Sequence, residues 1–146
     1  NMMRGYLDAP EKTAEVIRDG WYVTGDIAKI DEDGFIFITD RLSRFSKIGG
    51  EMVPHVKVED AINGILGDSA SVVVAVPDPS KGQRLIAVYT RQDVAPETLW
   101  ERLCQTDLPK LWIPKRESLL PIEAVPTLGT GKVDHKKVKA LALEKG

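Results

Sequence analysis

The sequence predicts an α+β fold, in which helices flank a central sheet of about three strands. Residues 72–76 form a continuous apolar run, which is typical of a strand buried on both faces. In segment 58–66, apolar residues recur at the i, i+3, i+4, i+7 and i+8 positions, which indicates a helix with one buried face. At 146 residues, of which 42% are hydrophobic, the chain is long enough for one ordinary core.

The beginning of the chain lacks the material for a core of its own. Helix-start signals predict a short helix over about residues 10–18. Two strands, 27–30 and 35–39, flank an Asp-Gly pair, which is a strong hairpin signal. One short helix and two strands cannot bury a core alone. We therefore expect residues 1–42 to be the end of a larger domain and residues 43–146 to be a domain of their own.

The rest of the chain contains enough apolar segments for such a domain. Strands are expected at 45–48, 51–53, 85–90 and 117–120, the first two as a small hairpin around Gly49 and Gly50. Helices are expected at 97–106, burying Leu99, Trp100, Leu103 and Cys104, and after a cap at Asp134, burying Val138, Leu141 and Ala142.

Composition limits the setting in which the chain works. A single cysteine, Cys104, excludes an intramolecular disulfide and fits a reducing compartment. No apolar run approaches the roughly 20 residues of a membrane helix, and no leader opens the chain. His55 and His135 have no partners at metal-ligand spacing, and the tryptophans are expected in the core or an interface rather than against nucleic acid bases. We expect a cytoplasmic domain with no metal site, no nucleic acid partner and no membrane segment.

Residues 22–26 read Tyr-Val-Thr-Gly-Asp and place a lone carboxylate, Asp26, after a Thr-Gly turn. A carboxylate in this position can accept hydrogen bonds from the paired hydroxyls of a ribose. An acidic residue after Thr-Gly is also common as a turn or cap residue, so both interpretations stay open.

Residues 126–133 read Pro-Thr-Leu-Gly-Thr-Gly-Lys-Val. A phosphate-binding P-loop would need glycine in place of Pro126 and serine or threonine in place of Val133, so that motif is rejected. What remains is Lys132 behind two glycines, whose ammonium can move onto a phosphate or a carboxylate and stabilise charge around phosphorus. A solvated lysine in a glycine turn is the plainer alternative.

A third stretch connects these two motifs. Residues 40–50 read Asp-Arg-Leu-Ser-Arg-Phe-Ser-Lys-Ile-Gly-Gly, and Val58 and Glu59 follow. In this order the three stretches resemble the C-terminal part of the adenylate-forming superfamily, which includes acyl-CoA synthetases, luciferases and the adenylation domains of peptide synthetases. The opening residues 1–13 also resemble the segment that precedes the Thr-Gly-Asp motif in that family. The resemblance covers essentially the whole chain.

The resemblance implies a role for each motif. Asp26 would bind the ribose of the nucleotide, Arg41 would also face the nucleotide, and Tyr22 and Thr24 would lie beside them. Lys132 would stabilise the charge that develops while the acid is adenylated.

The connecting stretch would control movement and the thiol step. Ser43 occupies the hinge position, where the family has Asp or Lys, and Asp40 departs from the glycine usual there. Gly50, with Gly49 beside it, matches the glycine that lies against the pantetheine arm, although a plain hairpin turn is an alternative. Glu59 is expected to open the following helix and to favour its N-terminus through the helix dipole.

The whole-protein function that the resemblance implies is an ATP-dependent acyl-activating ligase that uses ATP and Mg²⁺. A large N-terminal domain would supply the acid pocket, and this fragment alone is expected to be inactive. Residues 50–53, Gly-Glu-Met-Val, are most similar to the acyl carrier protein synthetase half of a bifunctional bacterial acyltransferase. That similarity implies a long-chain fatty acid, acyl carrier protein as acceptor and attachment of the parent to the inner membrane, with CoA as the other acceptor.

Two other functions stay open. Within the same class, the parent would be a fatty acyl-CoA synthetase or an amino-acid adenylation domain. In another class, the chain would be a non-catalytic docking module with a basic C-terminal face. On that face Lys136 and Lys139 lie three residues apart and are candidates for docking an acidic carrier protein. A solvated basic helix end that complements its own dipole is the alternative.

Overall fold

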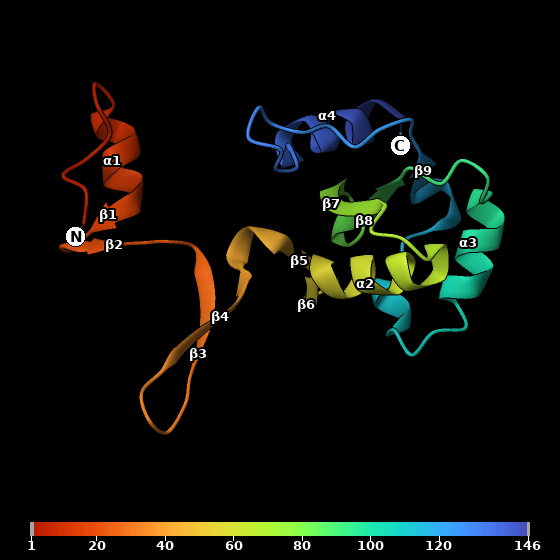
Figure 1. Cartoon of the computed structure of the whole chain (residues 1–146), viewed down its shortest axis with the longest axis horizontal. Coiled ribbons are helices and arrows are strands. Elements are labelled where there is room, and N and C mark those ends of the chain that lie inside the picture. The colour runs from red at the N-terminus through yellow and green to blue at the C-terminus, as the bar shows by residue number, and fades with distance from the viewer. Residues whose placement is uncertain (1, 146) are drawn as a thin grey trace. The chain divides into compact units, whose positions relative to one another are not determined.

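The computed structural model describes residues 2–145, so Asn1 and Gly146, which the predicted segments include, lie outside the described residues. The chain folds as two compact units, Asn1–Ser43 and Arg44–Gly146 (Figure 1).

The first unit contains one short helix and two small antiparallel hairpins. Helix α1 (Pro10–Val16) leads into β1 (Ile17–Arg18), which pairs with β2 (Trp21–Tyr22), and β3 (Asp26–Ile30) pairs with β4 (Ile36–Arg41). The predicted helix extended to about Arg18, but α1 ends at Val16. Ile17 takes extended backbone angles (φ −111°, ψ 111°), and residues 17–18 form β1 instead.

The hairpin of β3 and β4 is confirmed at the predicted turn. Asp31 Oδ1 accepts hydrogen bonds from the amides of Asp33 and Phe35 at 3.1 and 2.8 Å. Gly34 has φ +85°, a conformation that glycine adopts without steric cost. The side-chain cap of Asp31 and the freedom of Gly34 together explain why the chain reverses there.

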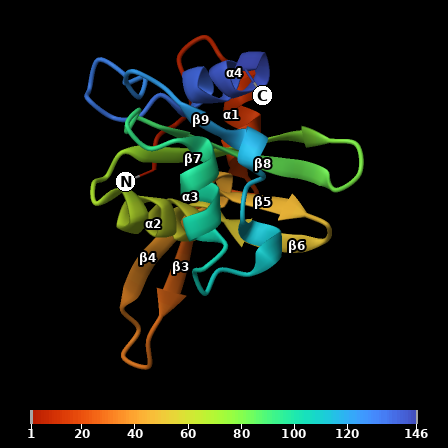
Figure 2. The same ribbon diagram turned by 90° about the vertical axis from the view of Figure 1, so that its right-hand side faces the viewer.

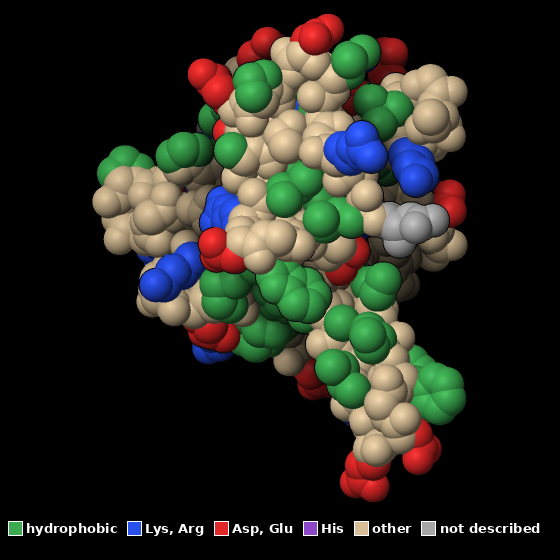
Figure 3. Space-filling model, turned by 90° about the vertical axis from the view of Figure 1, so that its left-hand side faces the viewer, with side chains coloured by type: hydrophobic (Ala, Val, Ile, Leu, Met, Phe, Trp, Pro, Cys, Tyr) green, Lys and Arg blue, Asp and Glu red, His purple; other side chains and the backbone are tan. Residues whose placement is uncertain are grey.

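The first unit has no buried core among residues 2–43. Ile36 and Ile38 on β4 are each 68% exposed, and Trp21 on β2 is 78% exposed. Hydrophobic side chains lie open on the surface of this unit (Figure 3). Its secondary structure is therefore held by backbone hydrogen bonds and turns, without the hydrophobic burial that normally stabilises a sheet.

The second unit is built on the predicted three-stranded sheet. Strand β7 (Ser71–Asp78) pairs antiparallel with β8 (Gly82–Tyr89), and β9 (Leu119–Pro121) joins the other edge of β8 in parallel. The third strand begins two residues later than predicted, because a 3₁₀ turn, η3 (Arg116–Ser118), precedes it.

Helices cover both faces of this sheet, which confirms the α+β class (Figures 1 and 2). Helices α2 (His55–Leu66) and α3 (Pro96–Leu103) lie on one face, and α4 (His135–Lys145) lies on the other. Side chains along β7 alternate between the two cores. Val73 and Ala75 pack in the cluster with α2 and α3, whereas Val72, Val74 and Val76 pack in the cluster with α4.

A small hairpin precedes helix α2 at the start of the second unit. Strands β5 (Phe45–Ile48) and β6 (Glu51–Pro54) meet at Gly49 and Gly50, whose φ values are +56° and +93°. Two successive residues with positive φ are typical of the turns that match the twist of a two-residue hairpin. Here glycine is required by the backbone itself.

One detail of the predicted core was wrong. Leu99 and Leu103 are fully buried, as predicted, but Cys104 is exposed and Trp100 is 36% exposed. Helix α3 ends at Leu103, with Cys104 as its C-cap, so the predicted apolar face does not continue to that residue.

The contrast between the two units predicts where proteases cut the chain. Because residues 2–43 contain no buried side chain, thermolysin should cleave within the first unit and leave a resistant fragment that begins near Arg44. Mass spectrometry of a time course measures this. Ile62→Ala, which removes a fully buried side chain at a cost of about 2–5 kcal/mol, should abolish the resistance. Equal cleavage rates in both units would contradict the expectation.

Candidate functional site

The first unit brings Asp26 and Arg41 together across the β3–β4 pair. They are direct partners in the strand register, and Arg41 Nε lies 3.0 Å from Asp26 Oδ1. This contact is an ion pair without hydrogen-bond geometry. Asp26 Oδ1 is buried and has no hydrogen-bond partner among residues 2–145. The guanidinium is 67% exposed and the carboxylate 18%. An oxygen shielded from water and left without a donor is suited to accept one from a ligand.

Thr24 and Tyr22 hold the surroundings of this carboxylate. Thr24 Oγ1 accepts a hydrogen bond from the Asp26 amide at 3.1 Å, and Gly25 between them has φ +74°. A hydrogen bond with the Tyr6 side chain raises the pKa of Tyr22, and the charges of Arg41 and Asp26 also act on this phenol. Three of the predicted nucleotide-binding side chains, Tyr22, Asp26 and Arg41, therefore lie within electrostatic reach of one another.

Asp40, the departure from the family pattern, fits the strand without a special turn. Its Oδ1 accepts a hydrogen bond from the Arg41 amide at 2.7 Å. Its strand partner is Ile27, next to a bulge between Ile27 and Ala28. The carboxylate of Asp40 thus stabilises the backbone at Arg41 directly.

Lys132 lies in the second unit, on a closed turn that extends from the core. The Leu128 amide donates to the Lys132 carbonyl at 2.8 Å, and the Gly131 amide donates to the Leu128 carbonyl at 2.9 Å. Thr127 and Val133 form an antiparallel bridge below the turn, and Gly131 has φ +79°. The Lys132 side chain is exposed. The backbone of this turn is fixed while the ammonium stays free to move.

The turn is joined directly to helix α4. Asp134 precedes the helix, and its Oδ1 accepts a hydrogen bond from the Lys137 amide at 3.1 Å, which is the predicted N-cap. Val138 and Ala142 are buried against the sheet, while Leu141 is only half-buried.

Ser43 and the two glycines lie at the start of the second unit. Ser43 is exposed, within the 3₁₀ turn η1 (Leu42–Arg44), and the division between the units follows it. A side chain added at Gly50 would meet no atom within 4 Å, although its φ of +93° would strain any other residue. The roles of Ser43 as a hinge and of Gly49 and Gly50 as a thiol channel stay predictions.

The sequence analysis missed a partly buried ion pair. Arg44 Nη2 donates to Glu59 Oε2, and Glu59 Oε1 accepts the amide of Val73 at 2.8 Å. The prediction that Glu59 opens helix α2 was wrong, because it is the fifth residue of a helix that begins at His55. Burial raises the pKa of Glu59, while Val73 and Arg44 oppose that rise. The only sequence signal was an arginine and a glutamate, each next to apolar positions.

A second missed contact supports the glycine turn. Ser46 Oγ and His55 Nε2 are 2.6 Å apart, and both residues are buried. The pair connects strand β5 to the first residue of α2. A serine and a histidine nine residues apart gave no signal that they would meet.

The charges at the start of α4 form a local cluster. Partial burial lowers the pKa of His135, the Arg44 guanidinium lowers it further, and Asp134 opposes the change. Lys136 and Lys139 are exposed and make no ion pair within the described chain. These two lysines are open to a partner, but nothing in the fold assigns one to them.

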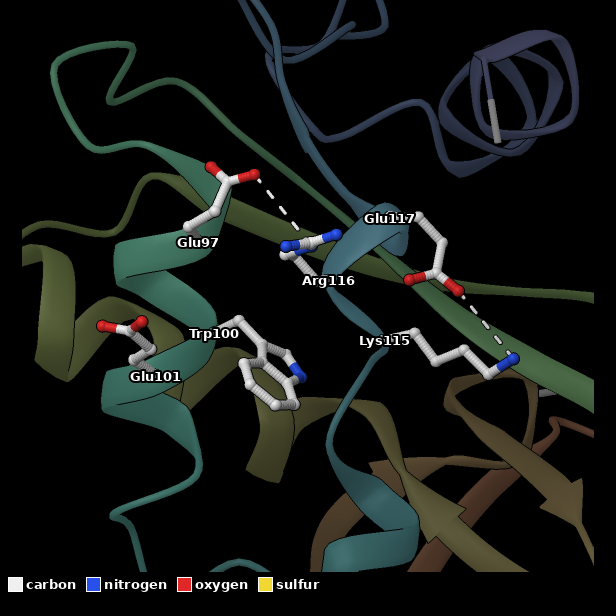
Figure 4. Close-up of a pocket in the computed structure, with 6 residues that line it drawn as sticks. All are labelled: Glu97, Trp100, Glu101, Lys115, Arg116 and Glu117. Atoms are coloured by element: carbon white, nitrogen blue, oxygen red, sulfur yellow. Dashed lines mark ion pairs between the residues drawn. The ribbon is translucent and has the colours of Figure 1, made fainter.

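A groove of about 340 Å³ lies between α3 and segment 115–117 in the second unit (Figure 4). Four of the charged residues that line it form two ion pairs: Arg116 Nε lies 4.0 Å from Glu97 Oε1, and Lys115 Nζ lies 3.8 Å from Glu117 Oε1. None of the predicted site residues lines it.

Within residues 2–145, no group of three or more His, Cys, Asp or Glu side chains is arranged to hold a metal ion. In the same range, every helix is too short or too polar to cross a bilayer.

Comparison with known proteins connects these residues to a set of ligases. No protein-family model matches the chain. The chain is 38% identical to feruloyl-CoA synthase of Amycolatopsis sp, 34% to long-chain-fatty-acid–CoA ligase FadD13 of Mycobacterium tuberculosis and 31% to 2-succinylbenzoate–CoA ligase of Listeria monocytogenes. These alignments cover 91%, 90% and 92% of the chain, but 27%, 26% and 28% of the relatives. The chain thus spans about a quarter of the length of the curated relatives it matches.

Solved structures show the same similarity in fold. ATP-bound MatB from Rhodopseudomonas palustris matches with a TM-score of 0.75 at 28% identity, over 94% of this chain and 28% of that one. The amide bond synthetase McbA from Marinactinospora thermotolerans matches with a TM-score of 0.73 at 33% identity, over 95% of this chain and 29% of that one.

The cluster at α4 predicts a pH dependence of stability. The pKa of His135 is lowered from 6.5 in the folded state, so the unfolded chain binds its proton more strongly. The stability that depends on neutral His135 is fully present above about pH 6.5 and is lost as pH falls through the folded-state pKa. We expect His135→Gln to flatten the decrease in urea midpoint between about pH 7 and pH 5.

Two features of the chain sharpen this measurement. Glu59 changes the stability in the opposite direction. Its raised pKa means that the folded state binds the proton more strongly, so its contribution to stability rises as the pH falls toward 4.5. The wild type and His135→Gln both retain Glu59, so this contribution is the same in the two proteins. Lys57→Gln, an exposed change on α2, is the control and should leave the wild-type slope in place. A slope unchanged by His135→Gln would show that this imidazole does not titrate as described.

Proposed function

The chain belongs to the C-terminal region of the adenylate-forming acyl-CoA synthetase superfamily, and we propose that its full-length protein activates a carboxylic acid with ATP and transfers the acyl group to a thiol. The observation that carries this proposal is Lys132, an exposed ammonium at the tip of a turn that backbone hydrogen bonds close. Such a turn fixes a cation in place while leaving it open to a substrate supplied from elsewhere.

In the first step, a carboxylate oxygen attacks the α-phosphorus of ATP. The bond from phosphorus to the bridging oxygen breaks, and pyrophosphate leaves with the electron pair. Negative charge spreads over the oxygens around phosphorus, and the Lys132 ammonium stabilises that charge without transferring a proton.

Asp26 and Arg41 would hold the nucleotide. The buried Oδ1 of Asp26, which is ion-paired with Arg41 but accepts no hydrogen bond among residues 2–145, fits a ribose hydroxyl, and the exposed guanidinium of Arg41 fits an adjacent polar group of the nucleotide. Mg²⁺ that accompanies ATP would neutralise part of the phosphate charge. The protein groups proposed here bind the sugar and stabilise the phosphorus centre.

In the second step, the thiol sulfur attacks the acyl carbonyl carbon of the adenylate, its proton is released to solvent, and AMP leaves with the electron pair of the broken bond. We propose that the Gly49–Gly50 turn lines the path of the pantetheine arm, because no side chain lies within 4 Å of the space beside Gly50. Ser43 would be the hinge about which the second unit rotates between the first and the second step, since it is exposed and lies at the end of the first unit.

A large N-terminal domain would complete the site. The exposed apolar residues of the first unit, such as Ile36 and Ile38, support this proposal, because a sheet face of that kind is normally covered. Residues 1–42 would then be part of the large domain, and residues 43–146 would be the small mobile domain.

CoA is the acceptor suggested by the names of the similar ligases. The finer alternative is an acyl carrier protein loaded with a long-chain fatty acid, in a parent attached to an inner membrane. The Gly-Glu-Met-Val string at 50–53 and the exposed pair Lys136 and Lys139 favour this alternative.

The role of Lys132 can be tested in the full-length protein. Lys132→Ala should slow acid-dependent exchange of pyrophosphate into ATP by at least about a hundredfold, because one preorganised charge is lost from the transition state. Thioester formation from a premade acyl-adenylate should survive. Lys57→Ala removes an exposed lysine from α2 and should change neither step. Equal loss in both steps would contradict the assigned role, and a wild-type protein that gives no exchange would favour a docking module.

The acceptor is tested by comparing CoA with acyl carrier protein on a long-chain acid. If carrier protein docks on α4, Lys136→Glu combined with Lys139→Glu should raise its apparent KM several-fold at low salt and leave pyrophosphate exchange unchanged. The same reversal at Lys57 is the matched control. An unchanged KM for carrier protein, together with efficient use of CoA, would leave CoA as the acceptor.

A further inference from the structure

Arg44 occupies a special position, because it is the first residue of the second unit and follows the proposed hinge, Ser43. Its side chain is only 25% exposed, and its Nε is buried without a hydrogen-bond partner among residues 2–145. A guanidinium carries a permanent charge, so burying it next to a chain junction is costly unless an anion is held against it.

Glu59 on α2 is that anion, and it has two partners. One carboxylate oxygen binds Arg44 Nη2, and the other accepts the Val73 amide at 2.8 Å. The Glu59 side chain is 12% exposed. This carboxylate therefore ties the residue after the junction to strand β7, which lies at the centre of the unit.

From β7 the contacts continue to the base of the Lys132 turn. Val72, Val74 and Val76 pack with Val138 and Ala142 of α4. Arg44 also acts on the first residue of α4, since its charge is one cause of the lowered pKa of His135. His135 follows the N-cap Asp134, only three residues after Lys132.

We propose that Arg44 is a positioning residue, which through Glu59 and strand β7, on which α4 packs, fixes the Lys132 turn relative to the junction at Ser43. This inference rests on the proposed function, because it assigns Arg44 to the adenylation step. A rotation at the junction then carries the turn with it as one rigid body. Without this connection, the position of the Lys132 ammonium relative to the α-phosphate would vary from one encounter to the next.

The glycine turn does not depend on the same connection. The Gly49 amide donates to the Lys81 carbonyl at 3.0 Å, the Lys47 amide donates to Gln83 Oε1 at 3.0 Å, and Trp112 Nε1 donates to Glu51 Oε1 at 2.9 Å. The β5–β6 hairpin is thus anchored to the β7–β8 connection and to η2 (Lys110–Trp112) independently of Arg44. Removing the ion pair should affect the two half-reactions unequally.

The first test is kinetic and uses the full-length protein. Arg44→Met keeps the length of the side chain and removes its charge. Its kcat for pyrophosphate exchange should fall about tenfold, while the KM for ATP and the rate from premade adenylate stay within about twofold. Glu59→Gln, which can still accept the Val73 amide, should give the same split, and Arg44→Lys should recover part of the loss.

The second test measures the electrostatic effect of Arg44 on His135 and needs no activity. The chain has two histidines, so NMR titration of the 146-residue chain follows His135 beside His55. Arg44→Met should raise the pKa of His135 toward its ordinary value. Lys57→Met removes an equal charge from an exposed site and should leave the pKa in place.

The outcomes separate this inference from the proposed function. If the wild-type protein exchanges pyrophosphate but Arg44→Met and Glu59→Gln slow both half-reactions equally, or neither, Arg44 is not a positioning residue. If the wild-type protein gives no exchange, the proposed function fails, and the titration still decides whether Arg44 reaches α4. An unchanged His135 pKa in Arg44→Met overturns the inference in either case.

Discussion

Burial of strand β7 on both faces is the constraint on which the second unit depends. Alternate residues enter two separate cores, so that Val73 packs with α2 and α3 while Val74 packs with α4. A strand in this position leaves no face for water, and its removal would expose both cores at once. Within the second unit, the β5–β6 hairpin and the helix that follows Lys132 are attached to this strand or its neighbours by hydrogen bonds or apolar contacts.

The second-unit residues to which functions are proposed, and Ser43 before them, lie outside the cores. Lys132 extends from a turn, Gly50 lies at a hairpin tip, and Ser43 lies on an exposed 3₁₀ turn. This separation has a physical reason, since a buried lysine would lose its charge or demand a partner. Under the proposed function, the cores would supply rigidity and the turns would present these residues to a substrate at the surface.

In the first unit, no core supports the residues to which a function is proposed. Asp26 and Arg41 are held together by a strand pair with no core beneath it, so their geometry relies on backbone hydrogen bonds and on the cap at Thr24. Such a pair would be held firmly only if another layer covered the sheet. The contrast between the two units is the structural basis for proposing that their functions are completed by a larger domain.

The sequence by itself determined the fold class, the buried strand at 72–76 and the motifs around Asp26 and Lys132, because apolar runs, turn residues and spacing are local properties. The sequence-based prediction was wrong for Cys104, which it placed in the core because it continued the helix beyond Leu103. It was also wrong for Glu59, which it placed at the start of a helix that begins at His55. Only the tertiary structure decided that Glu59 meets Arg44 and that Ser46 meets His55. These pairs join segments through the packing of α2 against the sheet, and no local pattern records which polar groups such packing brings into contact.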